Sequence, residues 1–356
     1  MKRVGILTFW GVPNCGTFAQ AYALRNSVQS VCNSSEVFQI AYLNETHKQF
    51  YDIGKDTATE ADKKRNDIFM ACYNQIPHLN ILGEEDTDLL LDKPIDTLIL
   101  GSDIIWDFSI SVFGDDKFLF GNKINANYKF SYAPSFGMCK SEWKRIPQHV
   151  TEGLLGLDSI SVRDNNSVRI VKNIAGRSAE LVLDPVWLWD WNHDSNIIEP
   201  QINNYVFVYG GDFSKEFQDN LRKWAVANDC IMIAYGTRKD DYNWCDEVLD
   251  TTLVSPFEVI GYFKNAKVVA TSTFHGMIFS LVFGKKAAYY KTDFIEAKIC
   301  DFLCEIGIYE KYSDKDDVCN MFETEWDYEK INSVIEKKRD VSLNYLVRNL
   351  RRIENV

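Results

Sequence analysis

A histidine within a run of hydroxyl residues and glycine is the strongest chemical signal in this sequence. The run Thr271-Ser-Thr-Phe-His-Gly276 follows a short β-branched stretch and precedes an apolar segment. We expect a strand, a turn and the start of a helix there, with Ser272 or Thr273 as the helix cap. A helix N-terminus attracts anions, so His275 is a candidate proton donor or acceptor. The alternative is a histidine that only bonds a turn carbonyl.

Two further charged residues directly follow predicted strands. Asp103 ends the run Gly101-Ser-Asp103, and Arg163 precedes a helical segment. The carboxylate is able to accept a proton or bind sugar hydroxyls, and a guanidinium fork suits carboxylate or phosphate. Trp106 is a candidate for stacking on a sugar ring. The alternatives are an Asx turn beside a core tryptophan, and a salt bridge from Arg163 to Asp164 or another local acid.

The N-terminus has the pattern of a strand, a glycine-containing loop and a helix. A strand over residues 2–9 leads into the loop 10–16, and apolar residues at helical spacing follow over 17–31. Such a loop presents backbone N–H groups to phosphate, but it matches neither the dinucleotide fingerprint nor the P-loop. Asn14 either orients a ligand or serves as an ordinary turn residue.

The remaining pattern predicts an α/β fold of two similar domains. Predicted strands repeatedly end in small or polar turns, which is how parallel sheets build a site at their carboxyl edge. We place an N-terminal domain at 1–191, with a helical insertion at about 45–92. A C-terminal domain at 204–320 carries His275, and a terminal helix covers 325–356.

Composition excludes several classes of function. The chain has 356 residues, 46% of them hydrophobic and 25% charged, as expected for a globular enzyme. Its net charge of −12 argues against nucleic-acid binding. Nine cysteines without a CxxC pair indicate neither a zinc site nor a disulfide framework, and we expect no metal.

Location is a further expectation from sequence. No stretch of the length that spans a bilayer is apolar, and the N-terminal pattern is not that of a signal peptide, so we expect a cytoplasmic protein. The terminal helix concentrates six cations: Lys337, Lys338, Arg339, Arg348, Arg351 and Arg352. They form either a solvated face, the favoured interpretation, or a contact with the inner face of a membrane.

Short blocks along the chain together resemble, in order, the motifs of the polysaccharide pyruvyl transferase family. These blocks are Asn14-Cys-Gly-Thr-Phe-Ala-Gln-Ala-Tyr-Ala-Leu24, Gly101-Ser-Asp-Ile-Ile-Trp106, Tyr132-Ala-Pro-Ser-Phe-Gly137, Ile160-Ser-Val-Arg-Asp164, Asp184-Pro185 and Thr271-Ser-Thr-Phe-His-Gly276.

The resemblance implies a GT-B-like fold, with two Rossmann-like domains facing across a cleft. It also implies transfer of the pyruvyl group of phosphoenolpyruvate onto two hydroxyls of a sugar. The acceptor would be a surface or capsular polysaccharide precursor, free or lipid-linked, and the products a pyruvate ketal and phosphate. Phosphoenolpyruvate is then the donor substrate, and no cofactor is expected.

The resemblance also implies roles for individual residues. His275 is the acid or base, Arg163 the anion clamp and Asp103 a base for a sugar hydroxyl. Implied substrate-binding positions are Asn14, Gly16, Gly101, Ser102, Trp106, Ser272, Thr273, Gly276 and Lys298.

Three positions depart from the family pattern. Ser272 stands for an aspartate, Thr273 for a serine and Lys298 for a frequent arginine, so that Lys298 keeps the charge but loses the bidentate fork. Two other functions compete with pyruvyl transfer. They are a GT-B glycosyltransferase that uses a nucleotide sugar, and a non-catalytic saccharide-binding relative.

Overall fold

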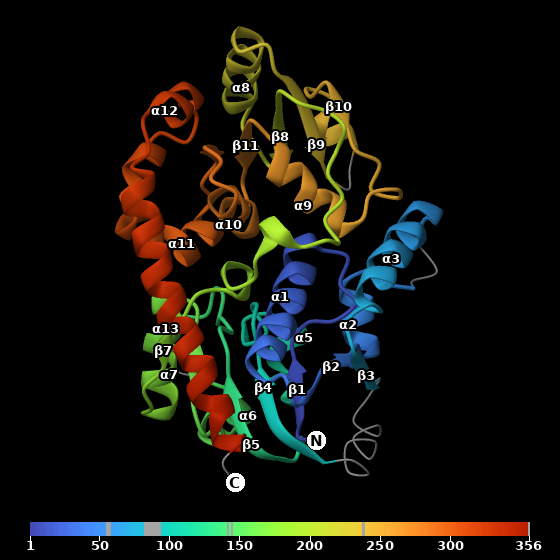
Figure 1. Cartoon of the computed structure of the whole chain (residues 1–356), viewed down its shortest axis with the longest axis vertical. Helices are drawn as coiled ribbons and strands as arrows, with labels where there is room; N and C mark the ends of the chain where they lie inside the picture. Colours follow the sequence, from blue (N-terminus) through green and yellow to red (C-terminus); the bar gives the residue numbers. More distant parts are fainter. Residues whose placement is uncertain (55–57, 82–93, 141, 144, 237–238, 355–356) are drawn as a thin grey trace. The chain divides into compact units, whose positions relative to one another are not determined.

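The computed structural model of the chain forms two compact units (Figure 1). It describes residues 1–54, 58–81, 94–140, 142–143, 145–236 and 239–354. Unit 1 contains Met1–Trp189 and Lys337–Val356, and unit 2 contains Asp190–Glu336. Each unit is built around its own parallel sheet, as the α/β pattern predicted.

Unit 1 has a five-stranded parallel sheet in the order β3-β2-β1-β4-β5. Along its central strands, successive side chains enter opposite cores. Leu98 and Leu100 pack into one apolar cluster, and Ile99 packs into the other. Burial on both faces explains the continuous apolar runs. The strands are β1 (Arg3–Leu7), β2 (Glu36–Tyr42), β3 (His78–Ile81), β4 (Ile95–Leu100) and β5 (Ala126–Ser131).

Helices supply the two layers around this sheet, and β6 and β7 form a separate two-stranded parallel sheet. Phe113, Val150 and Ile170 pack in one layer, and Leu24 and Leu346 in the other. The elements are α1 (Cys15–Val31), α2 (Glu45–Phe50), α3 (Glu60–Tyr73), α5 (Ser111–Gly114), η2 (Lys117–Phe120), α6 (Gln148–Leu155), β6 (Ser161–Val162), α7 (Asn165–Ala175), β7 (Glu180–Leu181) and η3 (Pro185–Trp187).

The predicted helical insertion at 45–92 contains a strand as well as helices. Helices α2 and α3 lie in it, and β3 adds to the sheet beside β2, with Gln39 opposite His78. The short, weakly patterned run His78–Ile81 did not indicate this strand. Residues 55–57 and 82–92 of the predicted insertion lie outside the described residues.

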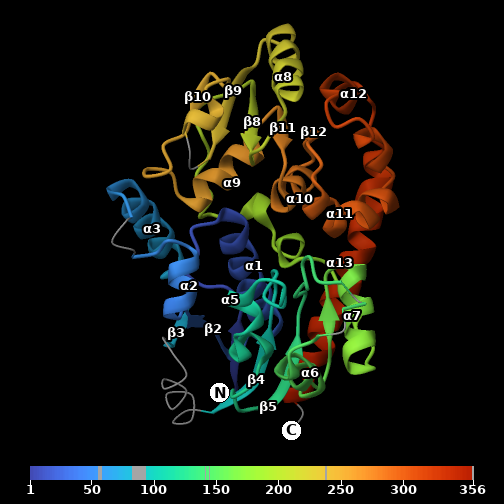
Figure 2. The same ribbon diagram turned by 180° about the vertical axis from the view of Figure 1, so that it is seen from behind.

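The five-stranded sheet of unit 2 repeats the strand order of the five-stranded sheet of unit 1. Its parallel strands are ordered β10-β9-β8-β11-β12 (Figure 2). The first strand of each unit is therefore central in its sheet. The strands are β8 (Tyr205–Tyr209), β9 (Ile231–Tyr235), β10 (Glu247–Val248), β11 (Val268–Thr271) and β12 (Ala287–Tyr289). The helical elements are η4 (Trp191–His193), α8 (Lys215–Ala227), η5 (Lys239–Tyr242), α9 (Pro256–Asn265), α10 (Phe274–Val282), α11 (Asp293–Glu305), η6 (Tyr309–Tyr312) and α12 (Val318–Glu323).

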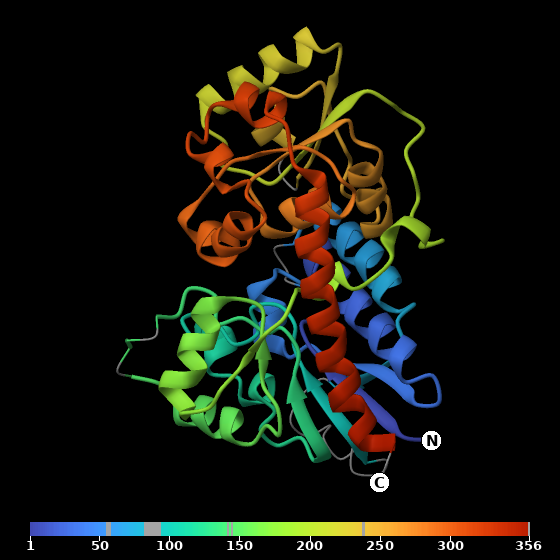
Figure 3. The same ribbon diagram turned by 60° about the vertical axis from the view of Figure 1, so that its left-hand side comes forward.

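The last helix, α13 (Tyr328–Glu354), begins in unit 2 and ends in unit 1 (Figure 3). Several of its cations are held by unit 1 itself. Arg348 forms an ion pair with Glu180, and Arg339 donates a hydrogen bond to a backbone carbonyl. Arg352 lies over the ring of Tyr128. Contact with a membrane stays a prediction, and across the described residues no helix has the length and hydropathy needed to span one.

Candidate functional site

In unit 1, Asp103 lies just beyond the carboxyl end of β4 and is held by three donors. Its Oδ1 accepts the Ile104 N–H at 2.9 Å and an Arg163 N–H at 3.2 Å, and its Oδ2 accepts the Thr17 hydroxyl at 3.0 Å. The Asp103 side chain is 10% exposed. Its carboxylate is therefore fixed in orientation, with a small part of its surface open.

Arg163 joins Asp103 to a second carboxylate, that of Asp184. Arg163 donates to Asp184 Oδ2 at 2.6 Å, and the side chains of Arg163 and Asp184 are 3% and 1% exposed. Burial lowers the pKa of the Arg163 guanidinium, but the charges of Asp103 and Asp184 outweigh it and raise that pKa above its ordinary value. We call these three residues the Asp-Arg-Asp cluster.

The cluster carries two negative charges and one positive charge. The salt-bridge interpretation of Arg163 is therefore the one observed, although its partners are Asp103 and Asp184. Asp164 instead caps α7, where it accepts the Ser167 N–H at 2.7 Å. A net charge of −1 does not by itself attract an anionic donor, so the role of Arg163 as an anion clamp stays a prediction.

Gly101 and Ser102 precede Asp103 and fix the position of its backbone. A Cβ on Gly101, whose φ is +115°, would collide with the Tyr132 carbonyl, which is why glycine is needed. Ser102 is fully buried, accepts the Asp103 N–H at 2.5 Å and lies 3.4 Å from Asp184 Oδ2. Thr8 donates to the Ser102 carbonyl at 3.0 Å. The Ser102 side chain is thus enclosed by protein in this structure, and its predicted substrate contact stays a prediction.

Trp106 lies in the core of unit 1, and its predicted stacking on a sugar stays a prediction. The side chain is fully buried, and its indole N–H donates to the Leu119 carbonyl at 3.1 Å. The rings of Phe136 and Phe120 lie 5.3 and 6.3 Å away. The indole therefore packs as the core interpretation expects.

Asn14 is the cap of α1. Its Oδ1 accepts the N–H groups of Gly16 at 2.9 Å and Thr17 at 3.1 Å. This capping fixes the first turn of α1, and that turn delivers the Thr17 hydroxyl to Asp103. Donor binding by Asn14 and Gly16 stays a prediction.

In unit 2, the predicted strand, turn and helix around His275 are present as β11, residues 272–273 and α10. Thr273 is the cap, because its hydroxyl accepts the Gly276 N–H at 3.0 Å. Thr271 accepts the Thr273 N–H at 3.1 Å and donates to the Tyr209 carbonyl at 2.6 Å. These bonds place the half-buried His275 in the first turn of α10. Imidazole at this position is able to exchange a proton with a bound group.

Ser272 joins the loops that follow β11 and β8. Its hydroxyl accepts the Gly211 N–H at 2.9 Å and donates to the Gly211 carbonyl at 2.8 Å. An ionised aspartate would accept the first bond but could not donate the second, so serine suits this loop. Gly210 has a φ of +128°, and a Cβ there would strike Ser272 Oγ.

Tyr242 binds the loop that follows β8 in unit 2. Its hydroxyl donates to the Gly210 carbonyl, and burial raises its pKa to about 12, so it stays a neutral donor. A Cβ at Gly276 would collide with the hydroxyls of Thr271 and Thr273, which explains the glycine after His275. Lys298 lies in α11, and its side chain lies outside the described residues.

Sequence reasoning missed the partners of these residues. Asp184 was noticed only as part of an Asp-Pro pair, although a carboxylate directly after a predicted strand is a usable signal. Thr17 lay within an apolar helical pattern, and Tyr242 lay in a loop without a motif. For these two, no local signal was available.

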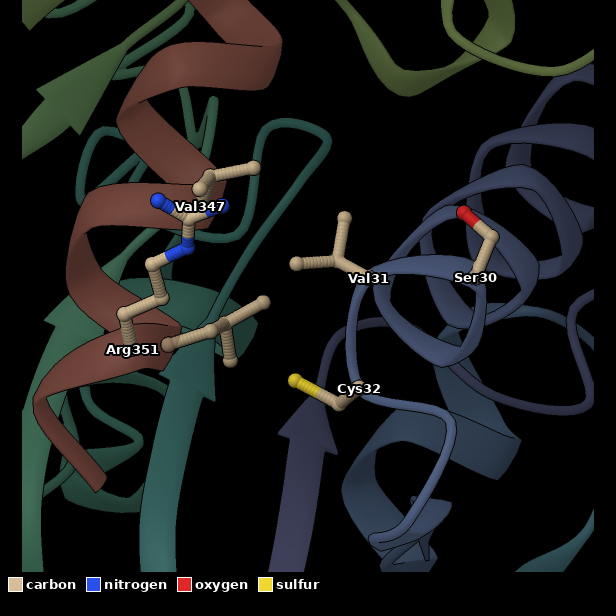
Figure 4. A pocket seen from close by; sticks show the side chains of 6 residues that line it. Ser30, Val31, Cys32, Val347 and Arg351 are labelled. Carbon is tan, nitrogen blue, oxygen red and sulfur yellow. The ribbon is translucent and has the colours of Figure 1, made fainter. Parts of the chain in front are cut away.

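A surface cavity of about 360 Å³ lies elsewhere in unit 1 (Figure 4). It is located where α1 ends, whereas Thr17 and Asp103 lie where α1 begins, so it opens at the opposite edge of the sheet. None of the predicted site residues lines it, and the residues that do are Ser30, Val31, Cys32, Val347, Leu350 and Arg351. Within the part of the chain that the structure describes, no cluster suited to a metal ion is found.

Two units of identical parallel topology, each with polar groups at the carboxyl edge of its sheet, define the GT-B class. The chain belongs to the polysaccharide pyruvyl transferase family, whose model matches residues 14–293. No curated protein matches the sequence.

Solved structures show the same fold at low sequence identity. The UDP-GlcNAc 2-epimerase from Neisseria meningitidis, bound to UDP-GlcNAc, has a TM-score of 0.52 and 10% identity, covering 99% of this chain and 100% of that chain. The UDP-GlcNAc 2-epimerase from Methanocaldococcus jannaschii has a TM-score of 0.52 and 10% identity, covering 94% and 98%. These likenesses establish the GT-B fold alone.

Proposed function

We propose that the protein transfers the pyruvyl group of phosphoenolpyruvate onto two hydroxyls of one sugar in a polysaccharide precursor. One observation carries the proposal: the family match covers all strands of both five-stranded sheets except β1, and it includes the capped histidine turn of unit 2. The chain retains the general acid or base and the fixed carboxylate that this chemistry requires.

The proposed reaction needs two proton transfers and no redox step. A proton is added to the methylene carbon of phosphoenolpyruvate as one sugar oxygen bonds to the adjacent carbon. Phosphate then leaves that carbon, and the second sugar oxygen takes its place. Of the two hydroxyl protons released, one balances the proton of the new methyl group and the other leaves with phosphate.

His275 is the proposed acid and Asp103 the proposed hydroxyl base. His275 lies in the first turn of α10, where the backbone N–H groups favour a bound anion. Asp103 is a carboxylate held by Thr17 and Arg163 with part of its surface open. A fixed acceptor of this kind suits removal of a proton from a sugar hydroxyl.

The test is a transfer assay with defined acceptors. The protein is incubated with phosphoenolpyruvate and either methyl β-D-galactopyranoside or methyl α-D-mannopyranoside. Released phosphate is measured together with the proton NMR signal of the new ketal methyl group. We expect both products from wild type and neither from His275→Ala.

The matched control is His193→Ala, which removes a histidine of the same unit whose side chain is 84% exposed. This variant should behave as wild type. Formation of a glycoside from UDP-GlcNAc, with no reaction of phosphoenolpyruvate, would replace the proposal with a glycosyltransferase. Binding of the glycosides without turnover of either donor would indicate a saccharide-binding relative.

A further inference from the structure

Asp184 is a buried carboxylate to which the proposed reaction assigns no role. It follows β7 and begins η3, where its Oδ1 accepts the Val186 N–H at 3.1 Å. Its Oδ2 accepts an Arg163 N–H at 2.6 Å and lies 3.4 Å from the Ser102 hydroxyl. With 1% of its side chain exposed, it is too enclosed to contact a substrate. Any function it has must act through its neighbours.

The distances within the Asp-Arg-Asp cluster are unequal. Arg163 lies 2.6 Å from Asp184 and 3.2 Å from Asp103, and the Asp184 contact is the more enclosed of the two. The attraction between opposite charges strengthens as distance and exposure fall. The guanidinium is therefore bound more tightly by Asp184 than by the proposed base.

From this geometry we propose that Asp184 is a positioning residue for Asp103. Asp184 forms the shorter ion pair with Arg163 and so weakens the attraction of Arg163 for Asp103. Arg163 can then orient the Asp103 carboxylate, and this carboxylate remains able to accept a proton from the sugar. The role of Asp184 in catalysis rests on the proposed function. The electrostatic coupling of Asp184 to Asp103 through Arg163 does not depend on that function.

Other groups around Asp103 come from several elements, and the Asp184 substitution replaces none of them. Thr17 on α1 and the Ile104 N–H donate to it. The phenols of Tyr51 and Tyr73 also face it, and burial, followed by the Asp103 charge, raises the pKa of both, so they stay neutral. Asp164 acts on Arg163 from the start of α7.

The experiment compares the titration of Asp103 in full-length variants. Protein labelled with carbon-13 at the aspartate carboxyl carbon is titrated by NMR, and Asp103→Asn identifies the Asp103 signal. In Asp184→Asn, Arg163 loses the nearer of these two carboxylates and acts more fully on Asp103, so the Asp103 signal should titrate at a lower pH than in wild type. Asp184→Glu keeps the charge and should restore most of the difference.

A matched control is Asp246→Asn. Asp246 forms an equally short ion pair, 2.6 Å from Arg222, but in unit 2. It should leave the Asp103 signal where it is in wild type. Circular dichroism and thermal unfolding identify any variant that fails to fold, and Asp184→Glu then supplies the comparison through its altered distance to Arg163.

Two results would overturn the inference. An Asp103 signal that titrates at the wild-type pH in folded Asp184→Asn would leave Asp184 as a structural residue only. An Asp103 signal that titrates at a higher pH in Asp184→Asn than in wild type would also contradict the inference, because it would mean that Asp184 favours the ionised form of Asp103. Titration of phosphoenolpyruvate into the same wild-type sample separates this inference from the proposed function, because absent donor binding counts against the latter without altering the Asp103 titration.

Discussion

Replacing Arg163 with methionine should destabilise unit 1 more than any other single charge removal discussed above. The change leaves the carboxylates of Asp103 and Asp184 without their shared cation, at 10% and 1% side-chain exposure. Breaking a buried ion pair by removing one partner costs about 3–5 kcal/mol, because the remaining charge keeps its desolvation penalty. For a unit of this size, that loss lowers the melting temperature by about 10 °C.

The loss is expected at neutral pH, where Arg163 forms ion pairs with Asp103 at 3.2 Å and with Asp184 at 2.6 Å. Arg163→Met removes both ion pairs and therefore differs from wild type in the free energy of unfolding.

Guanidinium chloride unfolding, followed by circular dichroism, measures this difference. The triple variant Arg163→Met/Asp103→Asn/Asp184→Asn should recover at least half of the loss, because the two buried charges that Arg163 neutralises are removed with it. Arg222→Met is the matched control, since its ion pair with Asp246 is more than one-third exposed on each side and should matter little. A loss below about 1 kcal/mol for Arg163→Met, or no recovery in the triple variant, would refute the reasoning.

Four smaller predictions concern single residues. Thr273→Ala removes the cap of α10 and should lower the free energy of unfolding of unit 2 by about 1 kcal/mol in denaturant titration, with Thr273→Ser near wild type. Gly101→Ala should destabilise unit 1 by about 1–3 kcal/mol in the same assay, because its Cβ meets the carbonyl of the β5 exit loop. Ser272→Ala removes both hydrogen bonds to Gly211 in the loop after β8 and should weaken phosphoenolpyruvate binding by about fivefold in calorimetry. Binding with wild-type affinity would show that this loop does not contribute to donor binding. Burial raises the pKa of the Cys245 thiol to about 12, so iodoacetamide at pH 8 should leave it unmodified in native protein, and rapid labelling seen by mass spectrometry would contradict that burial.

The fold was predictable because its signals are local. Apolar runs that end in glycine or hydroxyl residues indicate buried parallel strands whether or not their neighbours are known. The turn before His275 combines such a run with a cap residue, and both features lie within seven residues of one another. The strand His78–Ile81 was missed because only one of its four side chains is buried, so it lacks an apolar pattern.

The partners of charged and aromatic residues were not predictable in the same way. Arg163 lies 60 residues after Asp103 and 21 residues before Asp184, so only the fold brings the three together. The local acid Asp164 was the nearest candidate in sequence, but its carboxylate is used as a helix cap. Trp106 is a residue type that often stacks on sugar rings. Its burial depends on rings from η2 and from the loop after β5, which are distant from it in sequence.

The central claim is that phosphoenolpyruvate is the donor, and calorimetric titration of phosphoenolpyruvate tests it without knowledge of the acceptor. The titration is carried out on wild type, Arg163→Ala and His193→Ala, with UDP-GlcNAc as the competing donor. We expect saturable binding of phosphoenolpyruvate to wild type and His193→Ala, and no binding of UDP-GlcNAc. Weakened binding to folded Arg163→Ala would support the predicted anion clamp. Unchanged binding would leave Arg163 with no role in donor binding beyond its ion pairs with Asp103 and Asp184. Binding of UDP-GlcNAc to wild type, with no heat from phosphoenolpyruvate, would show that phosphoenolpyruvate is not the donor.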